Sequence, residues 1–173
     1  MTDLGVMRYF LGVEVHQTKE GIFINQQKYA REIIERFGVE NCNAVNTPMV
    51  PGTKLSKEEG GKEADATTFK QLIGSLMYLT HTRPDVMYVV CFLSRFMAAP
   101  REAHMLALKR VIRYVKGTVE LGLFYRRRAD DTLQGYFDSD FAGDVDGARS
   151  TTGYVFMMSG ATLLGVTRMD DAN

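Results

Sequence analysis

Apolar residues in the middle of the chain recur with the 3.6-residue period of helices. Residues 66–80 are predicted to form one helix, whose buried stripe consists of Phe69, Leu72, Ile73, Leu76 and Leu79 or Thr80. Arg83-Pro84 ends this helix, because a residue before proline avoids helical backbone angles, and Pro84 suits the first turn of the next one. The second helix ends at Pro100, and its stripe consists of Val86, Val89, Val90, Leu93 and Phe96 or Met97. A third helix, about residues 101–116 with Gly117 as its C-cap, buries Leu108, Val111, Ile112 and Val115.

Before this segment the apolar residues alternate with polar ones, which is typical of strands. Residues 9–15 and 22–24 are predicted to pair as a β-hairpin whose loop closes at Gly21. Asn25 is expected to cap a helix over residues 26–37. Residues 38–65 are rich in Gly, Pro, Asn and charged residues, so we expect an extended, mobile linker and a domain boundary there.

After residue 117 the apolar period changes to two. Short alternating stretches around residues 121–125, 133–136, 154–156 and 161–166 predict strands separated by Gly and Asp turns. The order of elements predicts an α+β fold: an N-terminal β-hairpin and helix, a linker, a three-helix segment, and a C-terminal incomplete antiparallel β-meander. We expect this meander to expose apolar side chains and an unpaired edge, which promotes self-association.

The composition narrows the class of protein. The chain of 173 residues is 45% hydrophobic and 24% charged, which is ordinary for a globular domain. Its two cysteines cannot build a disulfide framework and have no second metal ligand at zinc spacing. No apolar run reaches the roughly 20 residues that cross a bilayer, and the N-terminus has no signal segment. We therefore expect no membrane partner and a location in the cytoplasm or nucleus.

Charge is distributed unevenly, although the formal net charge is zero. Residues 101–128 contain eight Lys or Arg and two Glu, whereas residues 130–146 contain six Asp and no Lys or Arg. The candidate phosphate-binding residues of the basic segment are Lys109, Arg110, Arg113, Lys116, Arg126, Arg127 and Arg128. Cations in this pattern also form the solvated side of ordinary amphipathic helices, so both interpretations stay open on charge alone.

The acidic segment contains the carboxylates Asp138, Asp140, Asp144 and Asp146, a type of ligand that Mg²⁺ prefers. An EF-hand calcium loop is excluded, because Ala142 and Arg149 occupy positions that need oxygen ligands. The structural alternative is that aspartates after strands form turns by bonding to nearby backbone groups. No histidine stands at metal-ligand spacing, so structural roles are expected for His16, His81 and His104.

Several blocks of sequence together resemble one family. The N-terminal blocks are Tyr9-Phe10-Leu11-Gly12-Val13-Glu14-Val15 and Asn25-Gln26-Gln27-Lys28-Tyr29. The central blocks are Gly74-Ser75-Leu76-Met77-Tyr78-Leu79-Thr80-His81-Thr82-Arg83-Pro84-Asp85-Val86, Leu93-Ser94-Arg95-Phe96-Met97 and Lys116-Gly117-Thr118. In this order they resemble the reverse transcriptase of copia-type retrotransposon Pol polyproteins, downstream of the polymerase active site. Gly135-Tyr136-Phe137-Asp138-Ser139-Asp140 resembles the opening of a ribonuclease H domain.

The resemblance implies four regions and one catalytic position. Residues 1–38 would be a primer-grip and thumb remnant, 39–65 a linker, 66–118 the helical connection, and 119–173 a truncated ribonuclease H-like sheet. Asp138 matches the first Mg²⁺ ligand of the nuclease, whose two-metal chemistry needs several carboxylates. In the family, the polymerase's paired aspartates lie upstream of the matching segment, and the nuclease's remaining carboxylates lie downstream.

Three functional hypotheses follow. The first is a Pol fragment that is catalytically incompetent alone, needs no cofactor in isolation, and binds RNA–DNA hybrid or other nucleic acid; the intact ancestral enzyme would use Mg²⁺. The second is a domesticated or effector-like interaction protein derived from a copia element, although no Arg-x-Leu-Arg string supports export. The third is a nuclease that becomes active when a partner piece supplies the other carboxylates.

Overall fold

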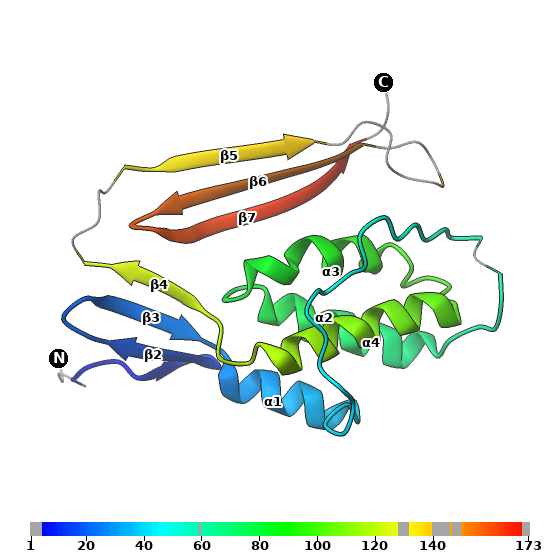
Figure 1. Cartoon of the computed structure of the whole chain (residues 1–173), viewed down its shortest axis with the longest axis horizontal. Helices are drawn as coiled ribbons and strands as arrows, with labels where there is room; N and C mark the ends of the chain where they lie inside the picture. The colour runs from blue at the N-terminus through cyan, green and yellow to red at the C-terminus, as the bar shows by residue number, and fades with distance from the viewer. Residues whose placement is uncertain (1–4, 59, 128–131, 140–145, 147–149, 171–173) are drawn as a thin grey trace.

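A computed structural model shows an α+β fold, in which two antiparallel sheets lie beside the helices (Figure 1). The structure describes residues 5–58, 60–127, 132–139, 146 and 150–170. Within these residues the helices are α1 (Gln27–Arg36), α2 (Ala66–Leu79), the 3₁₀ turn η1 (Pro84–Val86), α3 (Met87–Ser94) and α4 (Glu102–Gly117). None of the helices in this described part has the length and apolar character needed to cross a membrane.

The first sheet contains the predicted hairpin and one strand from much later in the chain. Its order is β1 (Tyr9–Phe10), β2 (Val13–Gln17), β3 (Gly21–Asn25) and β4 (Leu123–Arg126). We expected residues 121–125 to join the C-terminal meander, and this was wrong: β4 pairs with β3. Two glycines make the close pairing feasible, because a Cβ atom on Gly21 or on Gly122 would lie 2.2 Å from a carbonyl oxygen of the neighbouring strand.

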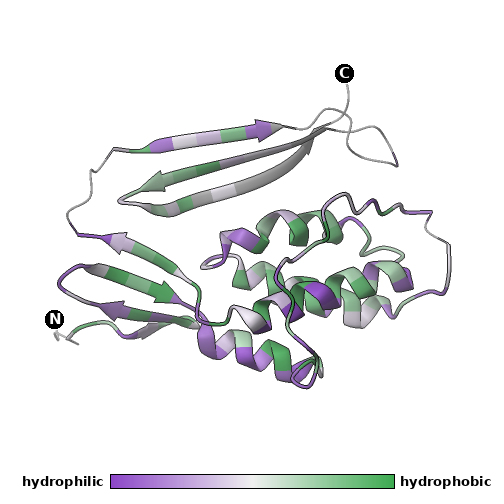
Figure 2. Cartoon of the chain, viewed as in Figure 1, coloured by the Kyte–Doolittle hydropathy of each residue, from purple (hydrophilic) through white to green (hydrophobic). Residues whose placement is uncertain are grey.

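The three central helices form the hydrophobic core with the stripes that the sequence predicted. Apart from the alternatives Thr80 and Met97, which are half-buried, the residues of the three predicted stripes are at most 2% exposed. Figure 2 shows hydrophobic and hydrophilic residues interspersed along α2, α3 and α4. Ile33 and Ile34 of α1 and Val39 pack into the same core. The core therefore spans the linker and joins α1 to α2–α4.

The helix ends differ from the sequence-based expectations in three places. The second predicted helix was expected to end at Pro100, but α3 ends at Ser94. Asn25 is the last residue of β3 and does not cap α1; the N-cap residue is Gln26, and its side chain makes no capping bond. Instead, the backbone N–H of Lys28 donates to the carboxylate of Glu14 on β2, and the distance from the Lys28 backbone nitrogen to Glu14 Oε1 is 2.7 Å. At the other end of the helical segment α4 runs through Gly117, and Thr118 is its C-cap residue.

The linker region 39–65 has no helix or strand among its described residues, but it makes contacts with the helices. His104, fully buried in the first turn of α4, bonds the backbone N–H of Arg101 through Nδ1 at 2.9 Å and the carbonyl of Ser56 through Nε2 at 3.0 Å. Its ring stacks on Phe96 with 3.9 Å between centroids. The expected structural role of His104 is confirmed, and its bond to the Ser56 carbonyl attaches the linker region to α4.

The second sheet is a three-stranded meander of β5 (Gln134–Ser139), β6 (Ser150–Met158) and β7 (Ala161–Asp170). It lies over α3, where a Cβ atom on Gly165 would come within 3.4 Å of the Met87 sulfur. The phenol of Tyr125 on β4 donates to the carbonyl of Thr162 on β7 at 2.9 Å and so connects the two sheets. Phe137 is 85% exposed, which confirms that the meander leaves apolar side chains uncovered.

Candidate functional site

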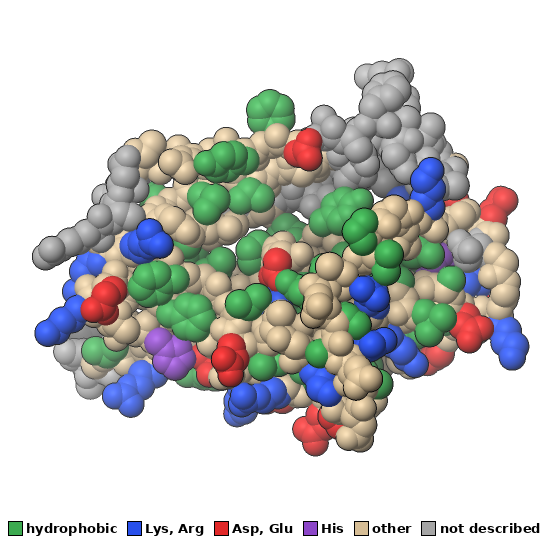
Figure 3. Space-filling model, in the orientation of Figure 1, with side chains coloured by type: hydrophobic (Ala, Val, Ile, Leu, Met, Phe, Trp, Pro, Cys, Tyr) green, Lys and Arg blue, Asp and Glu red, His purple; other side chains and the backbone are tan. Residues whose placement is uncertain are grey.

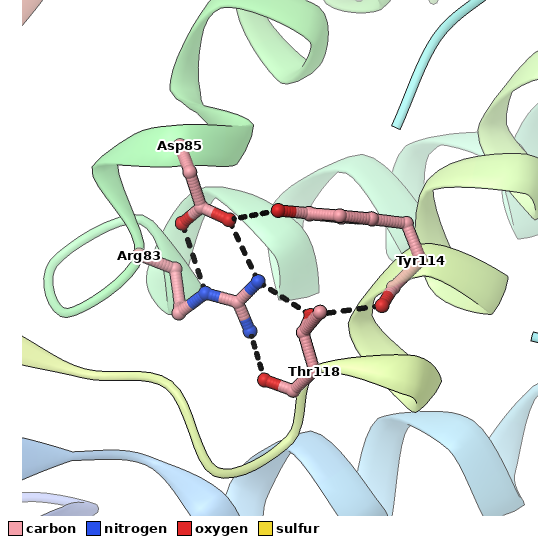
Figure 4. A network of polar contacts seen from close by, with 4 residues as sticks. All are labelled: Arg83, Asp85, Tyr114 and Thr118. Atoms are coloured by element: carbon pink, nitrogen blue, oxygen red, sulfur yellow. Dashed lines mark hydrogen bonds and ion pairs between the residues drawn. The ribbon is translucent and has the colours of Figure 1, made fainter. Parts of the chain in front are cut away.

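A buried arginine stands at the junction of the helices with the first sheet (Figure 4). The side chain of Arg83, in the turn before η1, is 3% exposed. Its Nε and Nη2 donate to the two carboxylate oxygens of Asp85 at 2.9 and 2.7 Å, a two-pronged pairing that suits the planar guanidinium. Nη1 and Nη2 also donate to the carbonyl and hydroxyl oxygens of Thr118 at 2.8 and 2.7 Å. One side chain thus ties the α2–η1 turn to the end of α4.

The electrostatics of this network favour the charged form of Asp85. Burial alone would raise the pKa of Asp85, but the hydrogen bonds and positive charge of Arg83 and the bond from the Tyr114 hydroxyl lower it overall. The pKa of Tyr114 is raised, by burial and by the neighbouring carboxylate. The groups of the network bond one another, so their role is to position the chain. Because β4 begins five residues after Thr118, the network fixes where this strand leaves the helices.

The predicted phosphate-binding residues fall into two separate places. On α4, Arg113 Nε donates to the carbonyl of Asn43 at 2.7 Å, and Lys116 Nζ donates to the carbonyls of Glu40 and Cys42 at 2.6 and 2.7 Å. Arg110 bonds the hydroxyl of Thr47 at 2.9 Å. These three cations hold the start of the linker against α4, while Lys109 is exposed on the same helix.

The other predicted cations lie at the end of β4. Arg126 and Arg127 are exposed, and the backbone N–H of Arg127 donates to the carbonyl of Glu20 in the β2–β3 loop at 2.9 Å. This bond brings the basic end of β4 beside Lys19 in the same loop. Arg128 lies outside the described residues. Those of the predicted cations that the structure describes therefore lie at two places, on α4 and at the end of β4.

Asp138 lies on β5, where it is exposed and pairs with Gly153 of β6. It lines a cleft of about 290 Å³ between the second sheet and the start of α3, together with Pro84, Met87 and Tyr88. Asp140 and Asp144 lie outside the described residues. No three His, Cys, Asp or Glu side chains in the described part of the chain meet in a way that could hold a metal ion. Asp138 is the only acidic residue among the described residues that line this cleft.

Asp146 has a structural role of a different kind from the local turn that was the alternative for the acidic segment, because its partners lie in the linker. Its carboxylate accepts bonds from the hydroxyl of Ser56 at 2.6 Å and from the backbone N–H of Lys57 at 2.8 Å. Arg95 lies 3.9 Å away. Burial would raise the pKa of Asp146, but these bonds and the nearby positive charges lower it overall. The residue connects the acidic segment to the linker and to the end of α3.

Comparison with known proteins places the chain in a family. Residues 1–51 match the family model described as reverse transcriptase (RNA-dependent DNA polymerase). The retrovirus-related Pol polyprotein from transposon RE1 of Arabidopsis thaliana is 41% identical over 149 residues, which are 86% of this chain and 10% of that protein. The chain belongs to the copia-type retrotransposon Pol polyproteins. It spans 10% of the length of the RE1 Pol polyprotein and so corresponds to a small part of such a protein.

The chain is also similar to shorter proteins. An uncharacterized mitochondrial protein of Arabidopsis thaliana is 40% identical over 154 residues, which are 89% of this chain and 64% of that protein. The secreted RxLR effector protein 161 of Plasmopara viticola is 46% identical over 89 residues, which are 51% of this chain and 63% of that protein. No solved structure matches the chain.

Sequence reasoning missed the Arg83 network as a structural centre. The signal was present, because Arg83-Pro84-Asp85 belongs to the longest block that resembles the copia family. The partner Thr118 is 35 residues further along the chain, so only the folded arrangement shows that they meet.

Proposed function

We propose that this Pol segment is a non-catalytic connection that binds nucleic acid and holds two sheets in a fixed relation to each other. The observation that carries the proposal is the Arg83 network, which ties the α2–η1 turn to the end of α4, five residues before β4 of the first sheet begins. The contact of Gly165 with Met87 and the bond from Tyr125 to Thr162 hold the second sheet to the same body. A connector between parts that act on one nucleic acid needs such fixed geometry.

The chain alone is proposed to have neither polymerase nor ribonuclease H activity. Asp138 is the one residue that matches a catalytic ligand of the family, and a two-metal mechanism needs several carboxylates. The test is incubation of the purified chain with an RNA–DNA hybrid and with a primed RNA template, in Mg²⁺ or Mn²⁺. Hybrid cleavage that Asp138→Asn abolishes would refute the proposal and favour a nuclease completed by a partner piece.

Nucleic-acid binding is proposed to be independent of sequence and to weaken as salt rises, because cations on phosphates release condensed counterions. Two pairs of cations can be compared with the same change of charge. Arg126→Glu with Arg127→Glu removes the exposed pair at the end of β4. Arg113→Glu with Lys116→Glu removes the pair that bonds linker carbonyls.

The affinity of each double variant for a duplex, an RNA–DNA hybrid and a single strand is measured by fluorescence anisotropy at low salt. If the Arg126→Glu, Arg127→Glu variant binds all three probes more weakly than the wild type does, the phosphates are bound at the end of β4. If the Arg113→Glu, Lys116→Glu variant is folded and binds more weakly, they are bound at α4. If the wild-type chain binds none of these probes at low salt, the nucleic-acid-binding part of the proposal is refuted.

The second candidate function is that of an interaction protein. It is favoured by the similarity of 89 residues to secreted RxLR effector protein 161 of Plasmopara viticola. The low-salt measurement separates the two candidates, because an interaction protein would stay folded and bind no DNA, RNA or hybrid.

A further inference from the structure

One face of the first sheet carries a row of ring side chains across three strands. His16 of β2 is paired with Phe23 of β3, and Phe23 is paired with Phe124 of β4. Residues that are paired across strands point to the same face, so the three rings form one row. Tyr125 points to the opposite face and bonds Thr162 of β7, which means that the row faces away from the second sheet.

Two glycines leave room for the Phe rings to pack against the backbone of the sheet. A Cβ atom on Gly21 would lie 3.0 Å from the Phe124 Cζ atom, and one on Gly122 would lie 2.9 Å from the Phe23 Cζ atom. Each ring therefore lies over the backbone of a neighbouring strand. The His16 and Phe23 rings are 6.2 Å apart between centroids and inclined by 33°. Phe124 is 36% exposed and His16 is also exposed, so the row is accessible from solvent.

Cations lie at one end of this row. Arg126 follows Phe124 by two residues on the same strand, which places it on the same face, opposite Gly21. Arg127 lies at that end too, where its backbone N–H donates to the carbonyl of Glu20, the residue after Lys19, and its charge acts on the Glu20 carboxylate. Figure 3 shows hydrophobic side chains and a His over the β2–β4 region, with Lys, Arg and acidic side chains around them. The surface thus combines exposed rings with positive charge.

We propose that this face binds single-stranded nucleic acid, with bases stacked on His16, Phe23 and Phe124 and phosphates bound by Arg126 and its neighbours. Aromatic side chains beside cations on a sheet are the arrangement that stacks unpaired bases without regard to sequence. In a duplex the faces of the bases are already stacked on each other, so a duplex can reach the cations but not the rings. The inference rests on the proposed nucleic-acid binding and adds the surface and the class of strand.

The experiment uses the full chain, a fluorescent twelve-nucleotide oligothymidine and a hairpin duplex of the same charge. Phe124→Leu still covers Gly21 but removes the ring, and it should weaken binding of the single strand by about tenfold, within the range for one stacked base. Phe124→Tyr keeps the ring and should bind as the wild type does. Ile22→Ala, on the opposite face, is the control for a general effect of changing the sheet. Circular dichroism establishes that each variant is folded, and His16→Ala, at an exposed position, is a second test of the row.

The outcomes separate this inference from the broader proposal. Loss of single-strand binding in Phe124→Leu and His16→Ala, with duplex binding unchanged, supports the ring surface. If both variants bind the single strand as the wild type does, the ring surface is refuted, and duplex binding lost in Arg126→Glu with Arg127→Glu still supports the proposed function. If the wild type binds neither probe, both proposals are refuted.

Discussion

Removing the guanidinium of Arg83 should destabilise the whole fold. Arg83→Met keeps most of the apolar stem but removes two bonds to Asp85 and two to Thr118. Breaking a buried ion pair by removing one partner costs about 3–5 kcal/mol. The Asp85 side chain is 34% exposed and can recover part of its hydration, so we expect a loss near the lower end, about 3 kcal/mol. This is a large part of the roughly 5–15 kcal/mol that stabilises a typical protein.

The measurement is urea unfolding followed by circular dichroism, with the free energy taken from the midpoint at an unchanged slope. The matched control is Arg101→Met, because Arg101 bonds Glu63 at 3.3 Å in a pair whose side chains are 32% and 83% exposed. Exposed pairs contribute at most about 1 kcal/mol, so this control should change the midpoint little. Hydrogen exchange should also become faster in β4 of Arg83→Met, since the strand loses its anchor at Thr118. Equal losses in the two variants would refute the role of the Arg83 network.

The remaining predictions concern acid, helix capping, the linker and local stability. The pKa of Asp85 is lower in the folded chain than in the unfolded one, so its contribution to the free energy of unfolding is present above the unfolded pKa and is lost as pH falls through the folded pKa. The urea midpoint should therefore decrease at pH values below about 4. Asp85→Asn should make this decrease smaller. Asp65→Ala should lower the midpoint, because Asp65 accepts the first backbone N–H groups of α2; an unchanged midpoint would show that the cap is dispensable. Arg113→Ala should make the linker start more sensitive to limited proteolysis at residues 40–47, and the same cleavage rate as the wild type would contradict its clamping role. Hydrogen exchange should be slow in residues 69–116 and faster in 150–170; uniform protection would mean that the second sheet is as stable as the core.

The helices could be predicted from the sequence because their signals are local. The spacing of Phe69, Leu72 and Ile73 determines one face of α2, and no distant residue is needed to recognise it. The break before Pro84 is equally local. These features depend on residues within one or two turns of each other, which is the range that a periodic pattern reports.

The features that could not be predicted depend on partners far apart in the chain. The alternation of apolar and polar residues predicts the strand at Leu123 but not its partner, because every strand has the same two-residue period whichever sheet it joins. The carboxylate that bonds the first turn of α1 belongs to Glu14 on β2, and the position of Asn25 just before the helix gives no sign of this distant partner. The cations of α4 were expected to face solvent or phosphate, and only the folded chain shows Arg113 and Lys116 bonding carbonyls of the linker.

The pairing of β3 with β4 also sets an order of events during synthesis. Gly21 is paired with Arg126, so the first sheet stays open at β3 until more than a hundred further residues have been added. Contacts of such long range slow folding, and an unpaired strand edge can bind other chains in the meantime. A chain shortened before Leu123 would keep that edge permanently, and a boundary drawn between the helices and the second sheet would divide the first sheet. The N-terminal hairpin, which belongs to the reverse transcriptase match, is therefore completed by residues that lie after the helical segment.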